Sequence, residues 1–564
     1  MTLHARVRTT TALLGTLGFA ALATLLGSAA TPRFMSDDPI QVERDTQNAV
    51  AMTNYEPNLF VDFAYNVITA HRATTNVPAR NVNTIGEVPD SSWFTNRAGS
   101  RSLTADEVAI GPDTTSGPAA GAWNVTSSKS DGVTPGFTIK DQTGQRWFLK
   151  FDPPGFRAMA TGTEVTVTKL MWALGYNVPE NHIAYMRRDQ LVITDTAKFT
   201  PAGGVTRRMK QSDIDRLLER ANREPDGSYR VVASKALEGK PIGRIAFLGT
   251  RSDDPNDLVP HEDRRELRGY GTFAAWLNHV DAKSINSLDM LVTRNGQSVV
   301  RHNLLDFGSA LGSGGTGPAD YWEGSQYLVS SDHMLSQMAS FGFSHPRWRT
   351  TPFFESSSIG RLPLDNTGFD PEAWKPREPN RAFMQARPDD KFWAAQRLVG
   401  ITRPIIEAAV AAGQFGDPES EAFLVRALTE RRDAIVRTYL PAINPIASPV
   451  LSSDGVLSFR NAAVDADVAH IPAEYRARWF RFNNETDVAS LIGETVGVTT
   501  ELPLPVETTF ATGSFLKVQL SADGARYPAW AVPVDAYFHH TGTDWQLVGV
   551  ERVPAPSIST STSH

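Results

Sequence analysis

Two helices are predicted in the centre of the chain. The first spans about residues 161–174, where apolar and small residues recur at three- and four-residue steps: Val165, Thr168, Leu170, Met171 and Leu174. Gly175 stands where a left-handed residue commonly ends a helix. The second helix is predicted over about 261–278, directly after the start signal Pro260.

Short apolar runs between turn residues predict strands on both sides of these helices. Residues 137–140 and 146–151 flank a hairpin turn, and 288–292 and 298–305 are joined by Arg294-Asn295-Gly296-Gln297. Asn-Gly is a strong signal for a two-residue hairpin turn. Further strands are expected over 182–186, 190–194 and 229–236. Helices resume over about 389–399, 403–412 and 419–439.

The pattern changes after a proline-rich joint, Pro441 to Pro449. Strand-like runs separated by turns fill residues 446–556, which favours a β-sandwich-like module. We expect the joint to be an exposed domain boundary with few contacts across it, so that truncation after Pro445 leaves a soluble remainder. The five prolines between Pro352 and Pro379 predict irregular chain there.

The one long apolar run lies at the start of the chain. Residues 11–30 follow Arg6 and Arg8 and end in Ser28-Ala29-Ala30, which has the form of a cleaved secretory signal. The alternative is an uncleaved membrane anchor, because about 20 residues can just span a bilayer. Either way, the sequence predicts export to the periplasm or the exterior. The polar tail 557–564 is expected to be disordered.

Composition excludes several classes of protein. The 564 residues are 21% charged with a formal net charge of −7, so no strong positive field exists to hold nucleic acid. A mean hydropathy of −0.27 and a single apolar run exclude a polytopic membrane protein. The absence of cysteine removes disulfides, thiolate nucleophiles and cysteine-ligated metals together.

The chemistry-bearing residues gather in two short motifs. His279-Val280-Asp281-Ala282-Lys283-Ser284-Ile285-Asn286 ends the second helix, and Asp306-Phe307-Gly308 follows the 288–305 hairpin. The first motif resembles the catalytic loop of the protein-kinase fold, and the second resembles its metal-binding motif. The order of elements agrees over roughly residues 122–440. The sequence resembles atypical kinases, of HipA type or secreted, more than ordinary serine/threonine kinases.

The resemblance implies a role for each of six residues. Asp281 would orient the acceptor hydroxyl, and Lys283 would steady the charge on the γ-phosphate. Asn286 and Asp306 would supply oxygen ligands to Mg²⁺ or Mn²⁺. Lys150, in the strand RWFLKF, would bind the phosphates of ATP, held by Glu164 in the following helix.

Each of these residues also has an ordinary structural explanation. A lysine and a glutamate on neighbouring elements commonly form a plain salt bridge, and an aspartate before glycine commonly makes a turn. We expect His279 to pack and to hydrogen-bond the loop backbone. A histidine-based metal hydrolase is disfavoured because the sequence lacks the HExxH spacing. A serine hydrolase is disfavoured because no GxSxG follows a strand.

The sequence departs from the kinase pattern in two places. No GxGxxG precedes residue 137, and the nearest candidates for a phosphate-covering loop are Gly132 and Gly136. No APE motif follows Asp306, because residues 320–324 read DYWEG instead. The acidic stretch 251–263 is expected to be a solvated loop, with a lid that contacts the acceptor or a metal as the alternative.

The predicted fold is therefore α+β: a bilobal kinase-like unit with an N-terminal extension and a C-terminal all-β module. Its predicted division is 1–30 signal, 31–116 extension, 117–240 N-lobe, 241–445 C-lobe, 446–556 β domain and 557–564 tail. The favoured function is ATP- and metal-dependent phosphorylation of a hydroxyl on a protein or small molecule. The alternative is a catalytically silent nucleotide-binding scaffold that recognises a cell-envelope partner through the β domain.

Overall fold

The structure is a computed structural model that describes residues 31–129, 134–201, 204–329, 338, 346–505 and 509–552. The predicted signal at 1–30, the tail at 557–564 and the candidate Gly132 lie outside these residues. The described chain mixes helices with five sheets, which places it in the α+β class. Within the described residues, no helix combines the length and the apolar character needed to cross a membrane.

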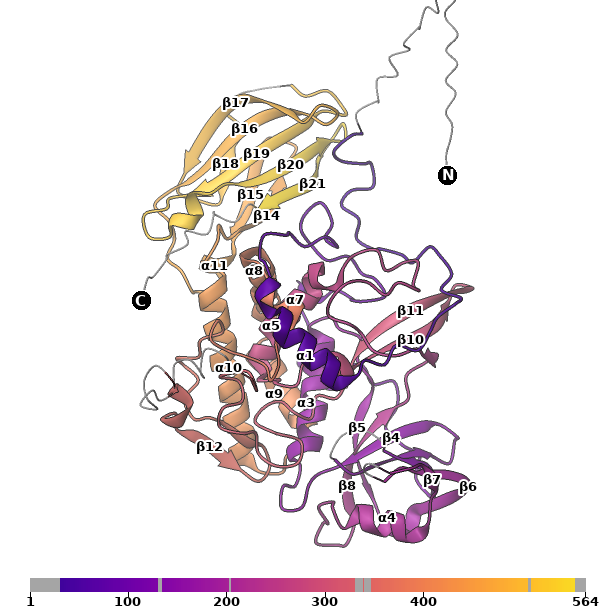
Figure 1. Ribbon diagram of the computed structural model, residues 1–564. Helices are drawn as coiled ribbons and strands as arrows, with labels where there is room; N and C mark the ends of the chain where they lie inside the picture. Colours follow the sequence, from indigo (N-terminus) through magenta and orange to yellow (C-terminus); the bar gives the residue numbers. More distant parts are fainter. Residues whose placement is uncertain are drawn as a thin grey trace, which may run out of the picture.

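A seven-stranded sheet forms one end of the molecule (Figure 1). Its strand order is β5-β8-β4-β3-β2-β6-β7, with these bounds: β2 Trp123–Ser128, β3 Gly136–Lys140, β4 Arg146–Phe151, β5 Asn181–Met186, β6 Leu191–Phe199, β7 Arg207–Arg208 and β8 Tyr229–Lys235. The predicted strands of this region are present. One face of the sheet has its own apolar core, which includes Trp147, Leu149 and Phe151 from alternate positions of β4. The helix α4 (Gln211–Leu218) adds Ile214 and Leu218 to that core.

Helices fill the middle of the molecule and share a second, larger core. They are α3 Met159–Ala173, α5 Arg265–Leu277, α7 Arg381–Met384, α8 Pro388–Val399, α9 Arg403–Ala412 and α10 Pro418–Tyr439. The hairpin β10 (Ser287–Arg294) and β11 (Gln297–Leu304) forms as expected around Asn295-Gly296, and β9 (Lys240–Pro241) pairs with β10. The region of 352–379, predicted to be irregular, contains one small hairpin, β12 (Phe353–Ser356) and β13 (Gly360–Pro363).

Two further sheets make up most of the C-terminal region. One has the order β14-β15-β18 and the other β17-β16-β19-β20-β21, with these bounds: β14 Ile446–Leu451, β15 Val456–Asn461, β16 Tyr475–Asn483, β17 Val488–Gly497, β18 Glu501–Pro503, β19 Phe515–Ala522, β20 Val534–His540 and β21 Trp545–Arg552. One short helix, α11 (Ala462–Asp465), and a 3₁₀ turn (Pro528–Ala531) interrupt the strands. The region is therefore predominantly β but not purely so.

The prediction that the proline-rich joint is exposed is wrong. Ile443, Asn444 and Ile446 are buried, and the amide of Asn444 donates to the carbonyls of Leu520 and Val532 at 3.0 and 2.8 Å. The apolar core of the helices continues without a break into the β region. Prolines predicted a break in secondary structure correctly, but a turn can be buried when its polar groups find partners.

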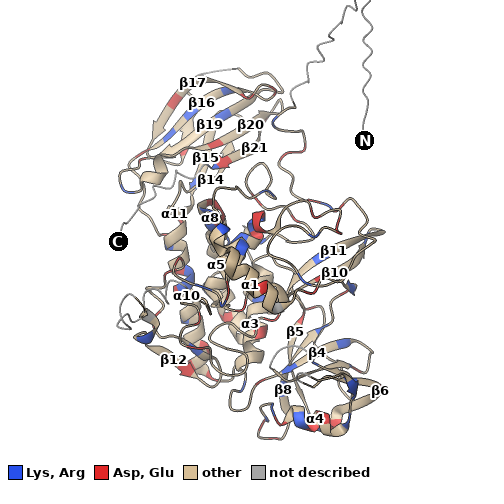
Figure 2. Cartoon of the chain, viewed as in Figure 1, with Lys and Arg blue, Asp and Glu red and all other residues tan. Residues whose placement is uncertain are grey.

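The N-terminal extension wraps along the helices and the β region. Phe34 packs in a cluster with Phe482 and Tyr537 of the β region. Farther along lie α1 (Leu59–Thr69), β1 (Arg97–Arg101) and α2 (Ala105–Ile110), and Figure 1 shows α1 in front of α5. Basic and acidic residues are interspersed over the elements in Figure 2, as the small net charge leads one to expect.

Candidate functional site

Lys150, Glu164 and Asp306 meet where the seven-stranded sheet faces α3. The ammonium nitrogen of Lys150 lies 3.1 Å from a carboxylate oxygen of Glu164 and 2.8 Å from one of Asp306. Alternation along β4 sends Trp147, Leu149 and Phe151 into the core of the sheet and Lys150 to the opposite face. Lys150 and Glu164 thus meet Asp306, which lies 156 residues beyond Lys150 in the chain.

The start of α3 is fixed to the end of β4 by Asp152. This buried carboxylate accepts hydrogen bonds from the backbone N–H groups of Ala158, Ala160 and Thr161 at 2.9–3.0 Å. It therefore supplies acceptors for the N–H groups that the first turn of a helix leaves without partners. Because Asp152 directly follows β4, this cap holds Glu164 opposite Lys150.

Glu164 also holds the segment that contains Asp306. Its second carboxylate oxygen accepts the backbone N–H of Phe307 at 3.0 Å, and the side chain of Glu164 is only 2% exposed. A Cβ at Gly308 would lie 3.3 Å from Glu164, so this position leaves little room for a side chain. The backbone of Asp306 is left-handed, with φ +61°, a conformation that aspartate tolerates better than most residues.

The charges at this point stabilise one another. Burial alone would lower the pKa of Lys150, but the carboxylates of Asp306 and Glu164 outweigh it and raise that pKa. Burial opposes ionisation of Asp306, yet Lys150 and Lys129 lower the pKa of its carboxyl to about 2. Asp306 is therefore a carboxylate and Lys150 an ammonium ion throughout the neutral range.

The loop after α5 brings Asp281, Lys283 and Asn286 together. The ammonium of Lys283 lies 2.8 Å from one carboxylate oxygen of Asp281, and the amide of Asn286 donates to the other at 2.9 Å. The backbone N–H of Leu305 donates to the carbonyl of Asn286 at 3.1 Å, which places this loop directly beside Asp306. All six residues singled out in the sequence thus belong to two adjoining clusters.

His279 has the structural role expected of it. It is 1% exposed, its Nδ1 lies 3.3 Å from the carbonyl oxygen of Ser309, and its ring packs edge-on against Phe307. Burial lowers its pKa, so the imidazole is neutral. It supports the segment after Asp306 from behind.

Sequence reasoning missed Arg377, a third side chain that holds Asp281. Its guanidinium lies 3.3 Å from Asp281 and also pairs with Glu323, while its backbone N–H donates to the carbonyl of Val280 at 2.8 Å. Glu323 belongs to the DYWEG segment that stands in place of APE. No local pattern marks Arg377, because it lies in the proline-rich stretch far along the chain.

The oxygen atoms near Asp306 fit a divalent metal. Only one oxygen of Asp306 is used by Lys150, and the amide of Asn286 turns its N–H toward Asp281, which leaves its oxygen available. Carboxylate and amide oxygens are the ligands that Mg²⁺ and Mn²⁺ prefer. The donors present therefore suit the predicted metal, and the ammonium of Lys150 suits a phosphate beside it.

The candidate Gly136 has a structural explanation. It pairs with Lys150 across β3 and β4, and a Cβ there would collide with the carbonyl oxygen of Leu149. Close approach of two strands therefore requires glycine at this position.

The prediction that residues 251–263 form a solvated loop is wrong. Asp257 is 5% exposed and accepts hydrogen bonds from His261 and Arg264 at 2.7 and 3.2 Å. Arg251 pairs with Asp289 of β10 at 3.0 Å, and the opposite oxygen of Asp289 meets the ring of His302 at 2.8 Å. Arg251 and Asp257 can be buried because each has a partner of opposite charge.

A second group with metal-ligating side chains lies away from this site. Ligand atoms of Asp113, Glu180 and His182 lie within 4.8 Å of one another. Lys169 pairs with Asp113, and Lys235 lies 2.6 Å from Glu180. Because both carboxylates are already neutralised by lysines, the group is explained as a salt-bridge cluster.

Comparison with known proteins adds little to this geometry. No protein-family model and no curated protein matches the sequence. Among solved structures, the chain is similar to the proinflammatory kinase CtkA of Helicobacter pylori, with 13% identity and a TM-score of 0.27 over 54% of this chain and 94% of that one. A TM-score this low supports no statement about the function of the present chain.

Proposed function

We propose that the protein is a kinase-like phosphotransferase that uses ATP and Mg²⁺ or Mn²⁺ to phosphorylate a hydroxyl group. The observation that supports this most is the position of the Lys150 ammonium between Glu164 of the following helix and Asp306. Phosphoryl transfer needs positioning and neutralisation of phosphate charge more than covalent chemistry. In the proposed complex, the seven-stranded sheet with α3 and the helical region act as the two lobes.

The two clusters divide the work of the reaction. Lys150 binds phosphate oxygens, and Asp306 and Asn286 hold the metal, which supplies neutralising charge for the phosphates when bound. Asp281 orients the acceptor hydroxyl and takes its proton as the oxygen attacks the γ-phosphorus and the bond to the β-phosphate oxygen breaks, releasing ADP. Lys283 lies beside Asp281 and steadies the charge on the transferred group.

Export of the chain is part of the same proposal and follows only from the sequence of residues 11–30. A catalytically silent nucleotide-binding scaffold differs from the enzyme in one observable, namely turnover. Binding and turnover therefore have to be measured separately.

The experiment measures thermal stability with ATP and either Mg²⁺ or Mn²⁺, since a ligand at 100 times its Kd adds about 2.7 kcal/mol. We expect the wild type to be stabilised and the variants Lys150→Ala and Asp306→Ala to lose this effect. Asp281→Ala should still bind nucleotide but lose turnover by about 10²–10⁴-fold. Lys140→Ala, an exposed lysine at the end of β3, is the control and should behave as the wild type.

Two results would count against the proposal. Equal nucleotide binding by the wild type and Asp306→Ala at every metal concentration would refute the metal site. Nucleotide binding without turnover in the wild type, tested by ATP hydrolysis, would refute the enzyme and leave the silent scaffold.

A further inference from the structure

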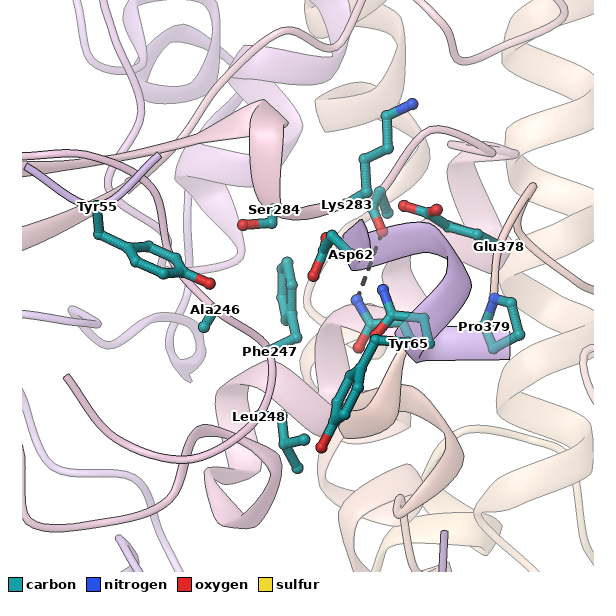
Figure 3. A pocket seen from close by; sticks show the side chains of 13 residues that line it. Tyr55, Asp62, Tyr65, Ala246, Phe247, Leu248, Lys283, Ser284, Glu378 and Pro379 are labelled. Carbon is teal, nitrogen blue, oxygen red and sulfur yellow. Dashed lines mark hydrogen bonds between the residues drawn. The ribbon is translucent and has the colours of Figure 1, made fainter. Parts of the chain in front are cut away.

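A polar pocket of about 130 Å³ lies beside the loop that contains Asp281. Its walls come from α1, the Phe247 segment, the loop at Lys283 and the segment of Glu378. In Figure 3, the side chains of Asp62 and Glu378 lie on either side of the stem of Lys283, whose ammonium group points away. That ammonium group instead pairs with Asp281.

Glu378 is buried without a partner. It is 9% exposed, and neither it nor the carboxylate of Asp62 makes a hydrogen bond or salt bridge with any residue that the structure describes. The two nearby cations are already matched, Lys283 by Asp281 and Arg377 by both Glu323 and Asp281. The pocket therefore has two acidic groups without counter-charges among the described residues.

Such an arrangement costs free energy unless the carboxyl groups take up protons or a cation compensates their charge. Burial, together with the negative charges of Asp62 and Asp281, raises the pKa of Glu378 to about 7, although Lys283 acts in the opposite direction. Burial likewise raises the pKa of Asp62. Both shifts have the direction expected of carboxyl groups that are buried without counter-charges.

The size and lining of the pocket define the kind of cation. Its volume equals that of roughly four water molecules, which suits an ammonium or guanidinium group on a short stem rather than a whole nucleotide. The rings of Tyr55, Tyr65 and Phe247 line it as well, and aromatic rings attract organic cations. Two of the other polar side chains already have partners, since Ser284 donates to the carbonyl of Ile245 and Asn380 donates to that of Ala282 at 3.4 Å.

We propose that this pocket binds an ammonium or guanidinium group on the acceptor, and that the phosphorylated hydroxyl belongs to a molecule carrying such a group. This inference rests on the proposed function, because it takes Asp281 as the residue that meets the hydroxyl. Two residues connect the pocket with Asp281. Lys283 lines the pocket and pairs with Asp281, and Arg377, which directly precedes Glu378 of the pocket in the chain, also pairs with Asp281. Amino sugars and lysine- or arginine-bearing peptides share this chemistry.

The test measures binding of n-butylammonium and n-butylguanidinium to the full chain by saturation-transfer NMR, with uncharged n-butanol as the reference probe. We expect saturable binding of the two cations only. Glu378→Gln and Asp62→Asn should each weaken it by about tenfold, the effect of losing about 1.4 kcal/mol of charge attraction. Glu372→Gln is the matched control, because Glu372 lies in the same segment but pairs with Lys391.

The outcomes separate this inference from the proposed function. Cation binding that survives in Lys150→Ala, a variant expected to lose nucleotide binding, places the cation site in the pocket independently of ATP. Three results would overturn the inference. They are equal cation binding by the wild type and Glu378→Gln, binding of n-butanol equal to that of the cations, and complete displacement of the cations by Mg²⁺, which would make the pocket a metal site. Where turnover is measurable, comparing an amino sugar with a lysine peptide as acceptor shows which of them carries the phosphorylated hydroxyl. For the acceptor that reacts, Glu378→Gln should raise KM and leave kcat unchanged.

Discussion

Replacing Glu378 by glutamine should stabilise the protein at alkaline pH and leave it unchanged in acid. The pKa of Glu378 rises from 4.5 to about 7 on folding, so the native state holds a proton that the unfolded chain has released. Between these values the native state binds more protons, and stability therefore falls as the pH rises. A shift of about 2.5 units corresponds to about 3 kcal/mol, lost in full above about pH 8.

Glutamine has the shape of the protonated side chain and cannot ionise, so Glu378→Gln avoids that cost. We expect its unfolding free energy to equal that of the wild type near pH 4 and to exceed it by up to about 3 kcal/mol near pH 8. For a chain of 564 residues this is a rise in Tm of about 2.5 °C. The assay is urea unfolding followed by tryptophan fluorescence at both pH values.

Glu372→Gln serves again as the control, because Glu372 is exposed, lies in the same segment and pairs with Lys391. If Glu378→Gln differs from the wild type by the same amount at both pH values, the carboxyl is not held in its protonated form. The pocket would then not hold unmatched negative charge at Glu378.

Three further predictions concern the scaffold. Asp257→Asn should lower the free energy of unfolding by about 3 kcal/mol at neutral pH, because it leaves His261 and Arg264 buried without their carboxylate. An unchanged free energy in chemical unfolding would show that these charges are hydrated in the native state. Truncation after Pro445 should yield aggregated protein by size-exclusion chromatography, because the helical core continues past it; a soluble monomer would contradict this. Gly175→Ala should lower Tm, because φ is +116° there and a Cβ would strike the ring of Phe94. An unchanged Tm would show that the backbone at residue 175 and the ring of Phe94 can adjust.

Sequence reasoning located the residues of the site where short-range spacing governs them. Asp281, Lys283 and Asn286 lie within one loop, and the interval from Lys150 to Glu164 is set by one strand and the turn into the next helix. Strands and helices in this part followed from turn residues and apolar periodicity in the same way. The catalytic and binding roles of these residues stay predictions until activity is measured.

Long-range partners could not be predicted in this way. Arg377 meets Asp281 from a segment without periodicity, and Arg251 appeared solvated because nothing local indicates that Asp289 of β10 would pair with it in the interior. The joint at Pro441 similarly looked like a linker because its burial depends on strands that follow later. Polar composition reports exposure only where charges have no tertiary partner.

The N-terminal extension imposes an order of events on folding. Arg33 forms ion pairs with Asp487 and Glu551, the second of them 518 residues away, and Phe34 packs on the same β region. At about 5–20 residues per second, synthesis delivers that anchor roughly half a minute to two minutes after the extension itself. The first described segment of the chain is therefore among the last to settle.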